Sequence, residues 1–234
     1  IVAITGKFDL AVAREIVEKT FGLVPKGAEP AKVEGEPKLA AAQRFEFKDA
    51  VEQPTLLMLF NGPKDNTPED FAAMMAYMVL SSDSGPLYAK LVHRDGIASV
   101  AGGYWDTRRL GGTFMFYARA ASGVDAAKLE AGLNSALKEI DAEGLSKDQM
   151  QAAISSLTSY FDSTVADPLS YAMLLQATAA STGDAKSWRA QIDRAARVTP
   201  DEALAVLRQI TATPAVTAII NPGPRNAELP PVVA

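Results

Sequence analysis

Segments with the apolar pattern of strands and segments with the pattern of helices come in separate blocks along this chain. This order constrains the fold more than any single motif does. A strand-like and a helix-like segment open the chain, followed by a stretch rich in proline and glycine. Beyond that stretch the order is strand, strand, two helices, two strands, several helices and a last strand. Clustered strands and clustered helices are typical of α+β folds. We therefore expect a two-layer α+β fold, a mostly antiparallel sheet with helices packed on one face.

The expected elements follow from periodicity and from the residues that end each run. Strands are predicted over residues 1–5, 44–48, 55–60, 97–105, 112–121 and 215–220. Helices are predicted over residues 10–21, 68–80, 87–94, 125–143, 146–163, 169–183, 187–195 and 201–210. Asp9 and Thr67 are expected N-caps, Ser146 and Gln149 form a capping box, and Gly22 is expected to end its helix in a left-handed conformation.

The same reading divides the chain into four parts. Residues 1–24 are expected to be the last strand and helix of a preceding domain, because a lone strand and helix cannot bury their apolar faces. Residues 25–42 read as a linker, since they are rich in proline, glycine and charge. Residues 43–222 are expected to form the main domain, and 223–234 a proline-rich tail or linker.

Composition excludes several classes of function. The chain is 48% hydrophobic and 22% charged, enough for a real core, and its net charge is −5. No basic stripe stands out, so nucleic acid is not an expected partner. No run approaches 18 apolar residues, so we expect no membrane span. The chain has no cysteine, which excludes disulfides, cysteine-ligated metals and cysteine nucleophiles.

His93 is the only histidine. An H-E-x-x-H zinc helix or a pair of catalytic histidines therefore cannot exist within this chain. As a metal ligand, His93 would need carboxylate partners, of which Asp95 is nearest in sequence. A structural role near the end of a short helix, where the helix dipole favours a partly exposed histidine, is the preferred interpretation.

The most distinctive stretch is S-G-P-L-Y-A-K-L-V-H-R-D-G-I-A-S-V at residues 84–100. Together with T-G-K-F-D at 5–9 and the polar helix start L-S-K-D-Q at 145–149, it resembles the insulinase/pitrilysin family of zinc metallopeptidases, the inverted zincins. The likeness runs over nearly the whole chain in the family's order and spacing. It implies the fold of a processing-peptidase-like, C-terminal-type domain that carries no zinc motif.

This resemblance implies an accessory role. Active relatives bind zinc through an inverted H-x-x-E-H helix in a preceding domain, so the resemblance implies a zinc ion in the parent enzyme, bound outside this chain. The implied function is the substrate-chamber domain of a zinc-dependent endopeptidase. Its implied partners are the zinc-bearing domain, a second family half in the same chain or in another subunit, and peptide substrate. The alternative is a non-catalytic homologue of the family that acts as a structural or assembly module.

Active assemblies of the family also carry an arginine followed seven residues later by a tyrosine, which help to bind substrate. On the alignment implied by the resemblance these positions fall on Val92 and Ser99, which cannot do that work. Arg94 and Tyr104 lie nearby at the wrong spacing. The resemblance therefore implies that this is the second of the family's four similar domains, or a domain of an inactive half. Bacterial relatives of this type often work in the periplasm, so the resemblance implies that location for a bacterial parent.

Within this chain the candidates for lining a substrate chamber are Ser99, Gly102, Gly103 and Tyr104. Paired glycines in a strand often mark a bulge or the close approach of another backbone. That backbone is either a substrate that adds as a strand or a packed helix of the domain itself. No residue of this chain is expected to be catalytic or to bind metal.

Overall fold

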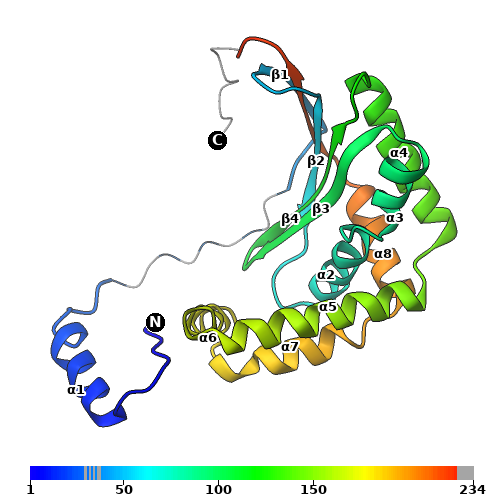
Figure 1. Ribbon diagram of the computed structural model, residues 1–234. Coiled ribbons are helices and arrows are strands. Elements are labelled where there is room, and N and C mark those ends of the chain that lie inside the picture. Colours follow the sequence, from blue (N-terminus) through cyan, green and yellow to red (C-terminus); the bar gives the residue numbers. More distant parts are fainter. Residues whose placement is uncertain (29–30, 32, 34, 36–37, 226–234) are drawn as a thin grey trace. The chain divides into compact units, whose positions relative to one another are not determined.

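The computed structural model describes residues 1–28, 31, 33, 35 and 38–225. The chain divides into two compact units, Ile1–Gly35 with Ser159–Trp188, and Glu36–Thr158 with Arg189–Ala234. The strands are β1 (Gln43–Asp49), β2 (Thr55–Gly62), β3 (Ala98–Arg108), β4 (Gly111–Ala120) and β5 (Val216–Pro222) (Figure 1). The α-helices are α1 (Leu10–Phe21), α2 (Pro68–Leu80), α3 (Pro86–Tyr88), α4 (Ala126–Glu143), α5 (Lys147–Ala166), α6 (Pro168–Thr182), α7 (Trp188–Ala195) and α8 (Pro200–Thr211). A π-helix, η1 (Ala89–Arg94), and a 3-10 turn, η2 (Ala185–Ser187), complete the set.

The strands of the second unit form one sheet in the order β1-β5-β2-β4-β3. β2 pairs antiparallel with both β4 and β5, and β3 pairs antiparallel with β4. Only β1 and β5 pair in parallel. The predicted α+β fold with a mostly antiparallel sheet is therefore confirmed, and β3 and β1 are its two edge strands.

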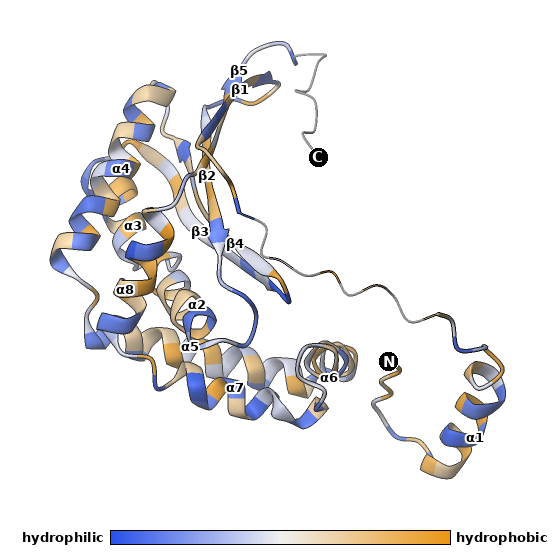
Figure 2. Cartoon of the chain, turned by 180° about the vertical axis from the view of Figure 1, so that it is seen from behind, coloured by the Kyte–Doolittle hydropathy of each residue, from blue (hydrophilic) through white to orange (hydrophobic). Residues whose placement is uncertain are grey.

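Helices of the second unit cover one face of this sheet, which explains the alternating burial along the strands. Leu56 and Phe60 of β2, Phe114 and Phe116 of β4 and Ile219 of β5 are all buried on that face. Helices α4 and α8 pack against β2, and α2 packs against β3 (Figure 1). Figure 2 shows the hydrophobic residues along β2 and on α8 that take part in this core. Each such large apolar side chain contributes about 1.5–3 kcal/mol by its burial.

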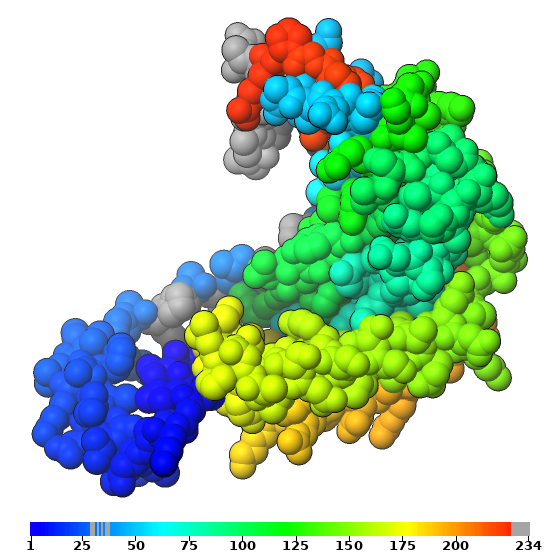
Figure 3. Space-filling model, viewed as in Figure 1, coloured from blue at the N-terminus to red at the C-terminus, as the bar shows by residue number. Residues whose placement is uncertain are grey.

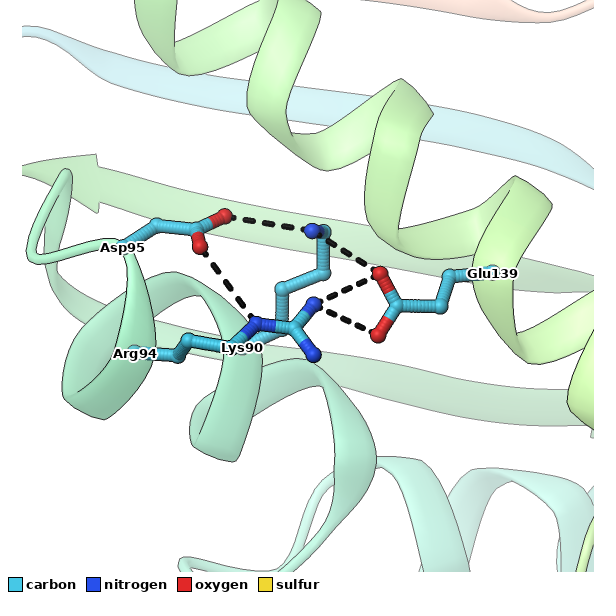
Figure 4. A network of polar contacts seen from close by, with 4 residues as sticks. All are labelled: Lys90, Arg94, Asp95 and Glu139. Atoms are coloured by element: carbon cyan, nitrogen blue, oxygen red, sulfur yellow. Dashed lines mark hydrogen bonds and ion pairs between the residues drawn. The ribbon is translucent and has the colours of Figure 1, made fainter.

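An ion-pair network joins η1 to α4 (Figure 4). Lys90 Nζ lies 3.2 Å from Asp95 Oδ2 and 2.9 Å from Glu139 Oε2, while Arg94 Nη2 lies 2.6 Å from the same glutamate oxygen. Hydrogen bonds from Arg94 and Lys90 hold the pKa of Glu139 below its usual range. The network fixes the segment that leads into β3.

In the space-filling view the side chains of α2 and α3 lie directly against the β3–β4 hairpin (Figure 3).

Some expected elements differ in the structure. Residues 1–5 are irregular rather than a strand, since the described residues offer them no strand to pair with. Gly22 follows α1 as predicted but is right-handed, with φ −64°. The helix expected over 87–94 is one α-turn followed by the π-helix. β3 extends to Arg108, so Asp106 belongs to the strand and not to the turn.

The first unit contains α1, α6, η2 and the end of α5 from Ser159 onward. Trp188 is buried, and its ring stacks on Phe161 at 5.9 Å and meets the edge of Tyr171 at 6.2 Å. α1 begins at its predicted cap, with Asp9 accepting from Val12 N, yet it buries no residue. None of the described helices is long and apolar enough to cross a membrane.

Candidate functional site

The four residues predicted to line a chamber all lie on β3, at an edge of the sheet. Ser99 stands at an irregularity of register between Ala98 and Val100, where β3 bulges against β4. Its hydroxyl donates to the carbonyl of Ala120 at 3.2 Å and lies 3.4 Å from that of Arg119. Ser99 is exposed, but its hydroxyl is held by the neighbouring strand and is not directed to a ligand.

Gly103 belongs to the helix-covered face. A Cβ atom built on it would lie 3.0 Å from Ser81 Oγ and 3.7 Å from the ring of Tyr77. Its backbone N–H donates to Ser81 Oγ at 2.9 Å and so points to the outer edge of β3, away from β4. Ser81, the residue after α2, thus occupies the outer edge of β3 near the middle of the strand. Gly103 accordingly serves the close packing of β3 on α2, the second of the two roles expected for the glycine pair.

Gly102 and Tyr104 belong to the opposite face of β3, because side chains alternate along a strand. Gly102 pairs with Tyr117 of β4, and a Cβ on Gly102 would lie 3.0 Å from the Tyr117 hydroxyl oxygen. The glycine therefore leaves room for the Tyr117 ring to lie across β3. Tyr104 beside it is 48% exposed. Within the described part of the second unit no helix covers this face, and we call Gly102, Tyr104 and Tyr117 the tyrosine surface.

Tyr117 was not identified as a candidate from the sequence. Its alternation with the buried Phe116 and Ala118 shows that it points away from the core. However, only the pairing of β3 with β4 places it over Gly102.

A buried carboxylate fixes β3 from the helix side. Trp105 Nε1 donates to Asp70 Oδ1 at 3.1 Å, and the Trp105 ring stacks on Tyr77 with 6.5 Å between centroids. Asp70 Oδ2 accepts from Asn66 N at 2.7 Å. Burial raises the pKa of Asp70 to about 6, although its hydrogen bonds favour the charged form. These contacts orient Trp105 and thereby the strand that carries Tyr104.

The residues at the family's arginine and tyrosine positions lie apart from any such surface. Val92 is half-buried on η1, and Ser99 is bonded to β4. Arg94 is engaged with Glu139. His93 is exposed and meets the ring of Tyr88 edge-on at 5.2 Å.

The residues present do not fit a zinc site. No group of three histidine, cysteine, aspartate or glutamate side chains that could hold a metal occurs among residues 1–28, 31, 33, 35 and 38–225. The only histidine has an aromatic neighbour, and the chain has no cysteine. What the tyrosine surface can offer is non-covalent: aromatic faces and phenol groups that bind apolar side chains and backbone amides.

Several solved structures share this fold. A protease from Helicobacter pylori matches with a TM-score of 0.81 and 16% identity over 93% of this chain and 54% of that chain. The peptidase M16 inactive domain from Pseudomonas fluorescens matches with a TM-score of 0.76 and 16% identity, over 95% of this chain and 53% of that one. The periplasmic protease PqqL from Escherichia coli matches with 0.68 and 12% identity, over 93% and 25%. At such identities the likeness establishes the fold alone.

The chain spans about half the length of the Helicobacter and Pseudomonas proteins. No curated protein sequence matches it. The family described as peptidase M16 inactive domain matches residues 1–157, most of the chain. The predicted resemblance to insulinase/pitrilysin zinc metallopeptidases is thus confirmed, and the chain belongs to the family of M16 peptidase inactive domains.

Proposed function

We propose that this chain is the accessory, substrate-chamber domain of a zinc-dependent endopeptidase. In this proposal the zinc-bearing domain and a second family half supply the metal and the substrate-clamping arginine and tyrosine. This chain supplies a wall against which the peptide is held. The observation that carries the proposal is the tyrosine surface, a sheet face that the helices of its own unit leave uncovered. It belongs to a peptidase-family domain whose described residues include no group that could hold a metal.

The geometry favours Tyr104 as the residue of β3 that meets a peptide, because its side chain is exposed on the open face. Gly102 is buried beneath the Tyr117 ring. Gly103 faces α2, and the Ser99 hydroxyl is bonded to β4. Pairing of a peptide along the outer edge of β3 would also have to displace Ser81 from the Gly103 amide. Contact through the face of the strand is therefore favoured over addition of the peptide to its edge.

Replacing Tyr104 by Ala in the full parent protein tests this role. We expect KM for peptides of twenty or more residues to rise about fivefold, which corresponds to about 1 kcal/mol, because an aromatic contact is lost. The turnover number should change little, since Tyr104 would bind substrate without taking part in the chemistry. Peptide hydrolysis at a range of substrate concentrations measures both.

Tyr160→Ala is the matched control, because Tyr160 is an exposed tyrosine of the other unit, 64% accessible. It should leave KM unchanged. An unaltered KM for Tyr104→Ala, with the fold intact by circular dichroism, would contradict the chamber role of this face.

A second candidate is the non-catalytic interaction module. The observation in its favour is a pair of exposed apolar side chains in the first unit, with Leu169 71% and Met173 63% accessible. Exposed apolar groups of this size often mark contacts with a partner. The coding sequence upstream of Ile1 separates the two candidates. An intact H-x-x-E-H motif there supports the peptidase, and a degraded one supports the module.

A further inference from the structure

A pocket of about 470 Å³ lies in the second unit between the start of α2, the segment that joins α7 to α8, and α8 itself. Its lining includes the apolar side chains of Phe71, Ala72, Val198 and Val206. This volume lies in the range that holds small ligands or single side chains with their flanking backbone. It is separate from the tyrosine surface, with which it shares no residue.

Two arginines line the pocket. Arg194 donates from Nη1 to Asn66 Oδ1 at 3.1 Å, and its guanidinium carbon lies 5.9 Å from the centroid of the Phe71 ring. Arg197 lies between α7 and α8 and is exposed. Among the residues that the structure describes, neither guanidinium has a carboxylate within the 4.0 Å of an ion pair. Both cations are therefore available to an anionic ligand.

The pocket lining also contains two glutamates, and each of them interacts with the N-terminus of its own helix and not with these arginines. Glu202 Oε2 accepts from the amide of Thr199 at 2.8 Å and from its hydroxyl at 2.9 Å, in the capping box of α8. Glu69 lies in the first turn of α2, where the helix dipole favours a negative charge. Their charges thus have local compensation. Arg194 has the dipole at the end of α7 and the Phe71 ring beside it, but neither it nor Arg197 has a carboxylate partner among the described residues.

We propose that this Arg194/Arg197 pocket binds the free C-terminal end of a peptide whose last side chain is apolar. A guanidinium is the group best suited to a carboxylate, because its N–H donors match the two oxygens. The apolar lining would take up the terminal side chain, and the volume limits the occupant to the last residue or two. The proposal stands whether or not the parent protein cleaves peptides.

Titration of the 234-residue chain with N-acetyl-Ala-Ala-Leu, as the free acid and as the C-terminal amide, tests the proposal by calorimetry. We expect the acid to bind at least tenfold more tightly than the amide, because a charged hydrogen-bonded contact is made only by the acid. Arg197→Gln should abolish this preference by weakening the acid alone. Arg119→Gln, which removes an exposed arginine of β4, should leave it intact.

A second variant tests the place of binding. Ala205 is an exposed residue of α8 in the lining, so Ala205→Trp should fill the pocket and abolish binding of the acid without disturbing the core. Ala152→Trp, at an exposed position of α5, is the matched control and should bind as the parent chain does. Equal binding of acid and amide, or an unchanged preference in Arg197→Gln, would overturn the proposal. Should Ala205→Trp fail to fold, the comparison of acid with amide in Arg197→Gln still decides.

Discussion

Asp70 carries a carboxylate into an almost dry site, with 5% of the residue exposed, although it belongs to the first turn of a helix. Hydrogen bonds from Asn66 N and Trp105 Nε1 partly replace the water that the carboxylate loses. Burial nevertheless dominates and raises its pKa to about 6. An unfolded aspartate has a pKa of about 3.9, so between these two values the folded chain holds a proton that the unfolded chain has released.

The contribution of Asp70 to stability should therefore fall as the pH rises from about 4 to about 6. The contribution of Asp70 favours folding most below its unfolded pKa, and it is lost as the pH passes the folded value. Two pKa units correspond to about 3 kcal/mol. Asp70→Asn cannot titrate, so its free energy of unfolding should lack this decrease and keep only the pH dependence of the other groups. Urea unfolding at several pH values between 4 and 7.5 measures both slopes. Parallel slopes for the two proteins would show that Asp70 titrates normally.

At the scale of residues, the sequence predicted interactions between near neighbours, such as helix caps. It did not predict which polar side chains would be buried. Asp9, Thr67 and the Ser146–Gln149 pair are caps as predicted, because a cap depends on neighbours within three or four positions. Asp70 reads in the sequence as an ordinary acid of a first helical turn. Its burial depends on Trp105, which another part of the chain brings to it.

Among the elements, β3 has an outer edge that the side chain of Ser81, the residue after α2, protects. Ser81 accepts the Gly103 amide there at 2.9 Å. Ser81→Ala should expose this amide to water, with a loss of about 1 kcal/mol in the free energy of unfolding. Hydrogen exchange followed by NMR should show that the Gly103 amide exchanges faster in Ser81→Ala than in the parent chain. The exchange rates of β2 amides, in the interior of the sheet, should rise only by the factor that the loss of global stability explains. Unaltered exchange at Gly103 would mean that other groups protect this edge.

Helix and strand positions agree closely with the periodicity, and the disagreements have physical causes. The helix over Leu10–Phe21 and that over Pro68–Leu80 have the predicted bounds. Residues 1–5 have the composition of a strand, but a strand forms only with a partner. The π-helix η1 closes with a bond from Asp95 N to Lys90 O, a pattern that apolar spacing alone does not indicate.

For the molecule as a whole, the absence of a zinc ligand set in the described residues has a direct consequence. The purified 234-residue chain, mixed with zinc and dialysed, should retain well below one zinc ion per chain. It should cleave no peptide, because no group of side chains that could hold a water-activating metal occurs in the described part of the chain. Elemental analysis and a fluorogenic peptide assay measure the two quantities. Hydrolysis that a chelator abolishes would contradict this expectation.

Relations between distant segments were the least predictable part. The fold class followed from the order of elements, but the parallel pairing of β1 with β5 joins Gln43 to Val216, far apart in the sequence. The Arg194/Arg197 pocket was equally hidden, because α2 and α8 contribute to it from far apart in the chain. The paired glycines of β3 are evident in the sequence, but only the pairing of β3 with β4 and the packing on α2 assign Gly102 and Gly103 to opposite faces.

The place of β5 between β1 and β2 also governs when this sheet can form. Synthesis on the ribosome delivers β1 and β2 long before β5, yet these two strands do not pair with each other, because each pairs with β5. Until then β1 has no partner in the sheet, and β2 has only its side toward β4. Such dependence on remote contacts slows folding and exposes unpaired strand edges. The nascent domain is thus most open to aggregation and to chaperones during the time in which its last helices are being made.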